Sequence, residues 1–166
     1  MTRRTLLIFT SLFGFPLGVN ATVSLVSSKN KKTTEKTIQA VQEHLFPKGS
    51  SIPSSKEMHA NTFLFETIGH KSYDKDIRVF VIEGAEELER REKGRFVSLS
   101  TKEKEKALRE YEKTDYGSSW LSRIMTLTME GMFCDPIYGS NIKEAGWEAL
   151  QSFGGLPRPT KKYLEI

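Results

Sequence analysis

The side chains in this sequence with the potential for chemistry are three histidines, one cysteine and scattered carboxylates. His44, His59 and His70 fall on separate segments, and none belongs to the H-E-x-x-H or paired-cysteine patterns that are typical of zinc sites. There is no Gly-x-Ser-x-Gly elbow for a nucleophilic serine and no CxxCH motif for a c-type haem. Gly154 and Gly155 precede Leu-Pro, so they do not open a phosphate-binding helix. The sequence therefore predicts no catalytic residue, no metal site and no cofactor-binding site in this chain.

Cys134 is the single cysteine, so no disulfide can form within the chain. Two interpretations remain open for it. A free cysteine is often a small buried side chain. A leftover thiol in an exported protein also suggests a disulfide to another subunit.

The densest motif is residues 131–155, which read GMFCDPIYGSNIKEAGWEALQSFGG. The carboxylate of Asp135 is expected to accept backbone N–H groups of the following turn, which contains Pro136, Tyr138 and Gly139. Two alternatives follow for the aromatic residues. Either the turn presents Tyr138 and Trp147 as a rigid patch for a partner protein, or both rings are buried.

The N-terminus has the three parts of a signal peptide, assigned to residues 1–21. Arg3 and Arg4 form the charged end, an apolar run follows, and Ala21 ends a small-residue exit. The paired arginines resemble a twin-arginine signal, although Leu6 stands where that signal usually has Phe. General secretion and a retained anchor are the alternatives, and polar residues interrupt the roughly 20 apolar residues that an anchor needs.

Length and charge indicate one small domain with a core of its own. The chain has 166 residues, and its net charge of +4 includes both arginines of the signal segment, which holds no acidic residue. The remaining charges are mixed in sign, without the clustered basic patch of a nucleic-acid-binding protein. We divide the chain into a signal peptide (1–21), a polar tether (22–33), a helical domain (34–155) and an extended tail (156–166).

Apolar spacing predicts an all-α domain of about six helices. The expected helices are residues 34–45, 56–67, 74–93, a charged helix from Ser100 to about 113, 120–133 and 142–153. Ser100 and Glu103 form a capping box, and Tyr116–Ser119 is expected to be a turn before the fifth helix. That fifth helix is apolar almost all round, which is typical of a central core helix. A β-rich run at residues 79–82 leaves a strand as the alternative within 74–93.

The C-terminal motif resembles that of the gluconate 2-dehydrogenase subunit 3 family. Its residues Met132–Asn141, Ala145–Trp147 and Gly154–Gly155 are similar to the family's G-x-F-x-D-P-x-Y-G-G-N…G-W pattern. His44–Pro47 and Phe96–Ser100 are similar to two weaker elements. Ser140 stands where the family has a second glycine, and Cys134 occupies a position that is not usually cysteine.

The resemblance implies a non-catalytic small subunit. Its expected partners are a large FAD flavoprotein of the glucose–methanol–choline oxidoreductase type and a multihaem cytochrome c, so FAD and haem c would lie in the partners. The cytochrome would hold the complex at the inner membrane, in the periplasm. The small subunit would escort the flavoprotein through export on its own signal. A stand-alone exported helical binding module is the alternative.

Overall fold

The computed structural model describes residues 19–162, with side chains from residue 31 onward. Residues 1–18, which include Arg3 and Arg4 of the predicted signal, lie outside this range. The chain divides into two units, residues 1–32 and 33–166. Everything that follows concerns the second unit, apart from the start of the first helix.

Six α-helices and three short 3₁₀ helices make up the described chain, and residues 19–162 contain no strand. The all-α prediction is therefore confirmed. Within residues 74–93 the chain forms the predicted helix and not the alternative strand. The α-helices are α1 (Val19–Leu45), α2 (Ala60–Gly69), α3 (Lys75–Arg91), α4 (Thr101–Glu112), α5 (Asp115–Phe133) and α6 (Ala145–Ala149). The 3₁₀ helices are η1 (Phe96–Ser98), η2 (Pro136–Tyr138) and η3 (Ile142–Glu144).

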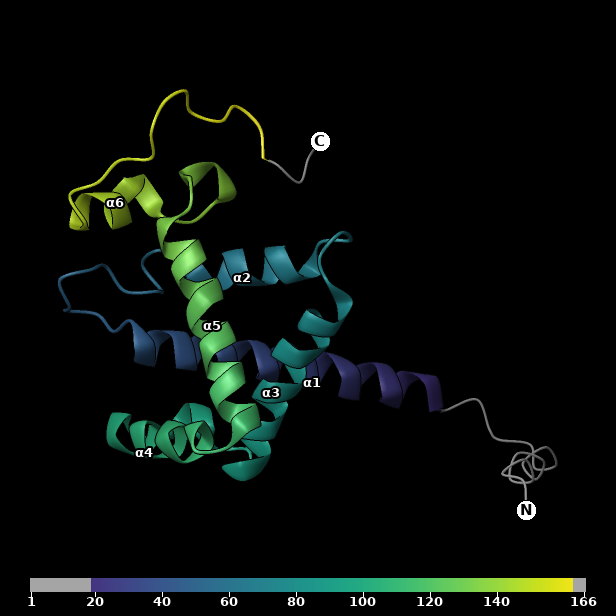
Figure 1. The fold of residues 1–166 in the computed structure, drawn as a ribbon. Coiled ribbons are helices and arrows are strands. Elements are labelled where there is room, and N and C mark those ends of the chain that lie inside the picture. Colours follow the sequence, from purple (N-terminus) through teal and green to yellow (C-terminus); the bar gives the residue numbers. More distant parts are fainter. Residues whose placement is uncertain (1–18, 163–166) are drawn as a thin grey trace, which may run out of the picture. The chain divides into compact units, whose positions relative to one another are not determined.

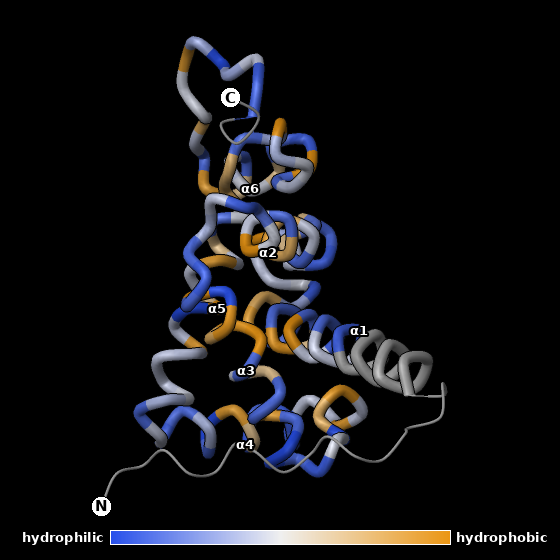
Figure 2. Tube along the Cα trace, turned by 90° about the vertical axis from the view of Figure 1, so that its right-hand side faces the viewer, coloured by the Kyte–Doolittle hydropathy of each residue, from blue (hydrophilic) through white to orange (hydrophobic). Residues whose placement is uncertain are grey.

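Helix α5 is the central element, as its apolar sequence predicts. It packs against α2, α3, α4 and α6, and it runs across the middle of the helices in Figure 1. Trp120, Ile124 and Met132 on this helix are fully buried, whereas Met129 is 45 % exposed. Helices α3 and α4 are more polar than α5 and bury a narrower apolar face, and Figure 2 shows hydrophilic positions along both.

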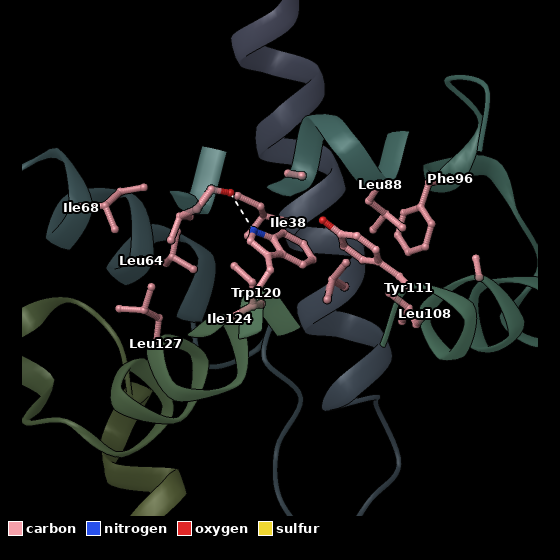
Figure 3. Close-up of a cluster of buried hydrophobic side chains, with 14 residues drawn as sticks. Ile38, Leu64, Ile68, Leu88, Phe96, Leu108, Tyr111, Trp120, Ile124 and Leu127 are labelled. Carbon is pink, nitrogen blue, oxygen red and sulfur yellow. Dashed lines mark hydrogen bonds between the residues drawn. The ribbon is translucent and has the colours of Figure 1, made fainter. Parts of the chain in front are cut away.

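The core is built around two large side chains that bond to the backbone of α3. The indole Nε1 of Trp120 donates to the carbonyl of Val81 at 2.9 Å, and the hydroxyl of Tyr111 donates to the carbonyl of Gly84 at 3.0 Å. Figure 3 shows both rings between the aliphatic side chains of α1, α2 and α4. Gly84 permits this approach, because a Cβ there would lie 2.0 Å from Cδ1 of Trp120.

The second half of α1 contributes buried polar contacts as well as the predicted Ile38 and Val41. The hydroxyl of Thr37 donates to Glu89 Oε1 of α3 at 2.6 Å. The amide of Gln42 donates to Thr128 Oγ1 of α5 at 3.0 Å. Because buried polar groups need partners, these bonds fix the position of α1 along α3 and α5.

Local side chains cap two helices, and the predicted capping box of Ser100 and Glu103 is confirmed. Ser100 and Glu103 form the reciprocal capping box of α4, and the carboxylate of Asp74 accepts from the N–H groups of Asp76 and Ile77 at the start of α3. The Ser100 hydrogen bonds also lower the pKa of the Glu103 carboxyl. Local sequence therefore determines where these two helices begin.

The predicted turn at Tyr116–Ser119 is wrong. Thr114 caps α5 by accepting from the N–H of Gly117 at 3.0 Å, so the helix begins at Asp115. Gly117 lies inside the helix because it packs tightly: a Cβ there would lie 2.1 Å from the carbonyl oxygen of Tyr111.

Three other boundaries differ from prediction. Helix α2 begins at Ala60 instead of residue 56, since Ser54 and Glu57 cap a separate turn that ends at His59, where φ is +56°. Helix α1 includes the residues assigned to the tether and begins at Val19. The last predicted helix, 142–153, is broken into η3 and α6. Residues 151–153, assigned to that helix, are not helical, and residues 156–162 of the expected tail contain no helix.

Candidate partner interface

The motif after α5 begins with the predicted Asx turn. Asp135 Oδ1 accepts from the N–H of Ile137 at 3.0 Å, Pro136 opens η2, and Gly139 ends it with φ of +83°. The ring of Tyr138 is half-buried and meets Phe63 of α2 edge-on, with 6.4 Å between the ring centroids. The turn therefore packs back onto α2.

Asn141 is the hydrogen-bonding centre of the motif. Its side-chain Nδ2 donates to the carbonyl of Cys134 at 2.8 Å, and its Oδ1 accepts from the N–H of Gly146 at 2.9 Å. Its own N–H donates to the carbonyl of Met58 at 3.2 Å. The residue is fully buried and has φ of +48°, a conformation that asparagine tolerates better than most residues. One side chain thus ties the end of α5 to the start of α6.

Trp147 is buried, so it is not presented at the surface. It is 9 % exposed, and its indole N–H donates to the carbonyl of Phe133 at 2.7 Å. Gly146 allows α6 to approach, because a Cβ there would lie 2.3 Å from the carbonyl oxygen of Met132. Trp147 and Asn141 therefore satisfy carbonyl groups that the end of α5 leaves without a helical partner.

Arg158 closes the motif from the C-terminal tail. Its guanidinium lies 4.5 Å over the ring of Trp147 and forms ion pairs with Asp135 at 3.1 Å and Glu144 at 3.0 Å. Gly154 lies flat on the same ring, since a Cβ there would be 2.2 Å from Cη2 of Trp147. The chain between α6 and Arg158 is therefore held against the indole at Gly154 and at Arg158.

This fixed segment carries three exposed apolar side chains, which we call the apolar strip: Leu150, Phe153 and Leu156. They are 52 %, 77 % and 86 % exposed. The N–H of Ser152 donates to the carbonyl of Trp147 at 2.8 Å, so the strip's backbone is anchored while its side chains face solvent. Apolar positions also continue beyond α6 in Figure 2. Large exposed apolar side chains on a fixed backbone are a feature of many protein interfaces.

A family model described as gluconate 2-dehydrogenase subunit 3 matches residues 32–155. The chain belongs to the gluconate 2-dehydrogenase subunit 3 family. It matches no curated protein and no solved structure. The suspected family is thus confirmed over the whole helical domain, including the motif of residues 131–155.

The two departures from the usual subunit 3 pattern contact each other. The hydroxyl of Ser140, at the second-glycine position, lies 3.0 Å from the thiol of Cys134. Ser140 is fully buried, and φ is positive at its neighbours Gly139 and Asn141 but not at Ser140 itself. A side chain is therefore accommodated here, and it gives the cysteine a polar partner.

The environment of Cys134 favours the interpretation as a packed side chain. Its Sγ also approaches the carbonyls of Gly131 and Asp135, at 3.5 and 3.4 Å. Burial raises the pKa of the thiol, and Ser140 opposes that effect by hydrogen bonding. Because disulfide exchange requires the thiolate, this position is poorly suited to rapid crosslinking. The intersubunit disulfide stays a prediction.

His44 and His70 form side-chain hydrogen bonds within the described chain. His44 Nε2 lies 2.6 Å from Glu105 Oε2, His70 Nδ1 lies 2.7 Å from Ser72 Oγ, and His59 ends the turn before α2. Among the described residues, no three His, Cys, Asp or Glu side chains are grouped as metal ligands would be. None of the helices described is both long and apolar enough to span a bilayer.

Two features of this C-terminal region were not predicted from the sequence. Leu150 and Phe153 were assigned to the predicted last helix, whose apolar spacing suggests an inner face. Arg158 follows a proline in the tail, and nothing in its local sequence indicates that it packs on Trp147.

Proposed function

We propose that this chain is a non-catalytic accessory subunit of a gluconate 2-dehydrogenase-type complex, and that it binds and escorts the large FAD flavoprotein. The family name describes a subunit of a larger enzyme. The observation that supports the binding role most directly is the apolar strip, because a fixed backbone with side chains up to 86 % exposed would gain from burial against a partner.

The escort role is supported by the leader. Arg3 and Arg4 open a segment that resembles a twin-arginine signal, a route for proteins that fold before export. A flavoprotein loaded with FAD needs such a route, and one leader serves two chains that already bind each other. The complex would then lie in the periplasm, held at the membrane by a multihaem cytochrome c that passes electrons onward.

Purification of the native protein from its own cells tests the binding role. We expect a flavoprotein to co-purify in a fixed ratio. A chain that purifies alone would instead favour the stand-alone binding module. Dye-linked dehydrogenase turnover by the chain by itself would contradict the non-catalytic assignment.

The variant Arg3→Lys with Arg4→Lys tests the escort role separately. We expect the flavoprotein to remain in the cytoplasm in these cells. Flavoprotein activity that still reaches the periplasm would exclude escort but leave the binding role intact.

A further inference from the structure

A second surface of the chain combines positive charge with exposed apolar side chains. It is a hollow of about 440 Å³ between the second half of α1, the turn before α2 and the start of α4. We call it the basic groove, and it is lined in part by Lys36, Lys56, Lys104, Val97, Pro47 and Glu43. Its elements differ from those that build the apolar strip.

Three lysines from three different segments converge on this groove. Lys36 comes from α1, Lys56 from the turn before α2, and Lys104 from α4. Within residues 31–162, none of the three amines has an ion-pair partner. Three lysine amines against one lining carboxylate, Glu43, leave an excess of positive charge that favours an anionic partner.

The lysines outnumber the carboxylates that line the groove. Glu43 lines the groove, and its Oε1 accepts a hydrogen bond from the amide of Gln39 at 2.7 Å. Glu105 is engaged by His44 at 2.6 Å and by Arg109 at 2.9 Å. The His44 contact also joins α1 to α4, so the two walls of the groove are connected.

The apolar lining distinguishes an acidic protein segment from a free anion. Val97 is 39 % exposed and lies with Pro47 in the same hollow as the lysines. A small oxyanion would use the amines and leave Val97 in water. An extended segment with carboxylates around one apolar side chain would use both kinds of contact.

We propose that the basic groove docks an acidic segment of the partner subunit, with an apolar side chain against Val97 and carboxylates at the three lysines. This inference rests on the proposed function, because it assigns the occupant to the dehydrogenase complex. It adds a charge-dependent contact to the apolar contact at residues 150–156.

The test uses two triple variants that remove the same charge. Lys36→Gln, Lys56→Gln and Lys104→Gln empty the groove of its amines, while Lys71→Gln, Lys75→Gln and Lys93→Gln alter exposed lysines elsewhere. The probe is a fluorescent peptide, Asp-Glu-Leu-Glu-Asp, measured by anisotropy at physiological salt. Urea midpoints of both variants check that the fold is kept.

We expect the groove variant to bind the peptide about tenfold more weakly, as the loss of three exposed ion pairs implies, and the control variant to bind nearly as the parent does. Replacing the central Leu of the peptide by Ser should weaken binding further. Equal losses in both triple variants would overturn the proposal. Full competition by inorganic phosphate, with no effect of the Leu-to-Ser change, would also overturn it in favour of a small-anion site.

Co-purification separates this inference from the proposed function. If the parent chain fails to co-purify with a flavoprotein, the proposed function fails whatever the peptide does. If it co-purifies but the groove variant binds the peptide as the parent does, only the groove proposal fails.

Discussion

Replacing Asn141 by alanine should destabilise the chain more than any other single change in the C-terminal motif. Asn141 bonds to the carbonyl of Cys134 at 2.8 Å and to the N–H of Gly146 at 2.9 Å, and it is fully buried with φ of +48°. Alanine can make neither bond and is less suited than asparagine to a left-handed backbone. The three losses act at one residue.

The expected magnitude follows from these contacts. A buried group left without its hydrogen bond costs about 1–3 kcal/mol, and Asn141→Ala orphans one N–H and one carbonyl. A left-handed conformation costs an alanine about 1–2 kcal/mol. Together the free energy of unfolding should fall by about 3–8 kcal/mol, a large part of the roughly 5–15 kcal/mol that holds a domain together.

Urea unfolding followed by far-UV circular dichroism measures this loss. Asn141→Gly is the matched control, because glycine loses both side-chain bonds but tolerates the backbone angles. Glycine should therefore be less destabilising than alanine by about 1 kcal/mol or more. A loss below about 1 kcal/mol for Asn141→Ala would refute the assignment of Asn141 as the centre of the motif. Equal losses for Ala and Gly would refute the backbone part of the reasoning.

Three further predictions concern the core and the thiol. Gly117→Ala places a Cβ 2.1 Å from the Tyr111 carbonyl oxygen and should lower the free energy of unfolding by at least about 1–3 kcal/mol in urea; stability within about 0.5 kcal/mol of the parent would contradict the close packing. Trp120→Phe removes the bond to the Val81 carbonyl and should cost about 2–4 kcal/mol by the same measurement; a neutral effect would show that this carbonyl finds another partner. Burial raises the pKa of Cys134 in the folded chain, so the unfolded chain loses the thiol proton at a lower pH than the folded chain does. The free energy of unfolding should therefore fall as pH rises above about 8.5, the ordinary pKa of a cysteine. This dependence of stability on pH should weaken in Cys134→Ser. Alkylation of the native thiol faster than that of a free cysteine would contradict its burial.

Features that depend on contacts between residues close together in the sequence were predictable. The capping box of Ser100 and Glu103 and the Asx turn of Asp135 involve partners two or three residues away. The spacing of Ile38 and Val41 likewise indicated the buried face of α1. Periodicity and caps therefore gave the all-α class and two helix starts without knowledge of the packing.

Features that depend on contacts between residues far apart in the sequence were not predictable. Gln42 is polar, yet it is buried because its amide bonds to Thr128. Thr128 lies 86 residues away in the sequence, so local pattern does not reveal this bond. Gly117 suggests a turn, and only the approach of Tyr111 explains why a glycine lies inside α5. Polar burial and close packing of this kind depend on how the helices assemble.

The apolar strip was not predictable for the same reason. Leu150 and Phe153 have the spacing of an inner helix face, but α6 ends at Ala149 and leaves both exposed. The path of the following segment is set by the contact between Trp147 and Arg158, which are 11 residues apart in the sequence. Local periodicity cannot reveal a surface that such a contact creates.

The most direct test of the central claim is co-purification of the flavoprotein with strip variants expressed in the native cells. Phe153→Ala with Leu156→Ala removes the two most exposed apolar side chains, and Val79→Ala with Met129→Ala, at 50 % and 45 % exposure, is the matched control. Since burying two such side chains contributes about 3 kcal/mol or more, we predict at least a hundredfold weaker association for the strip variant and parent-like association for the control. Flavin that co-purifies undiminished with the strip variant would contradict the claim that this segment is the partner interface.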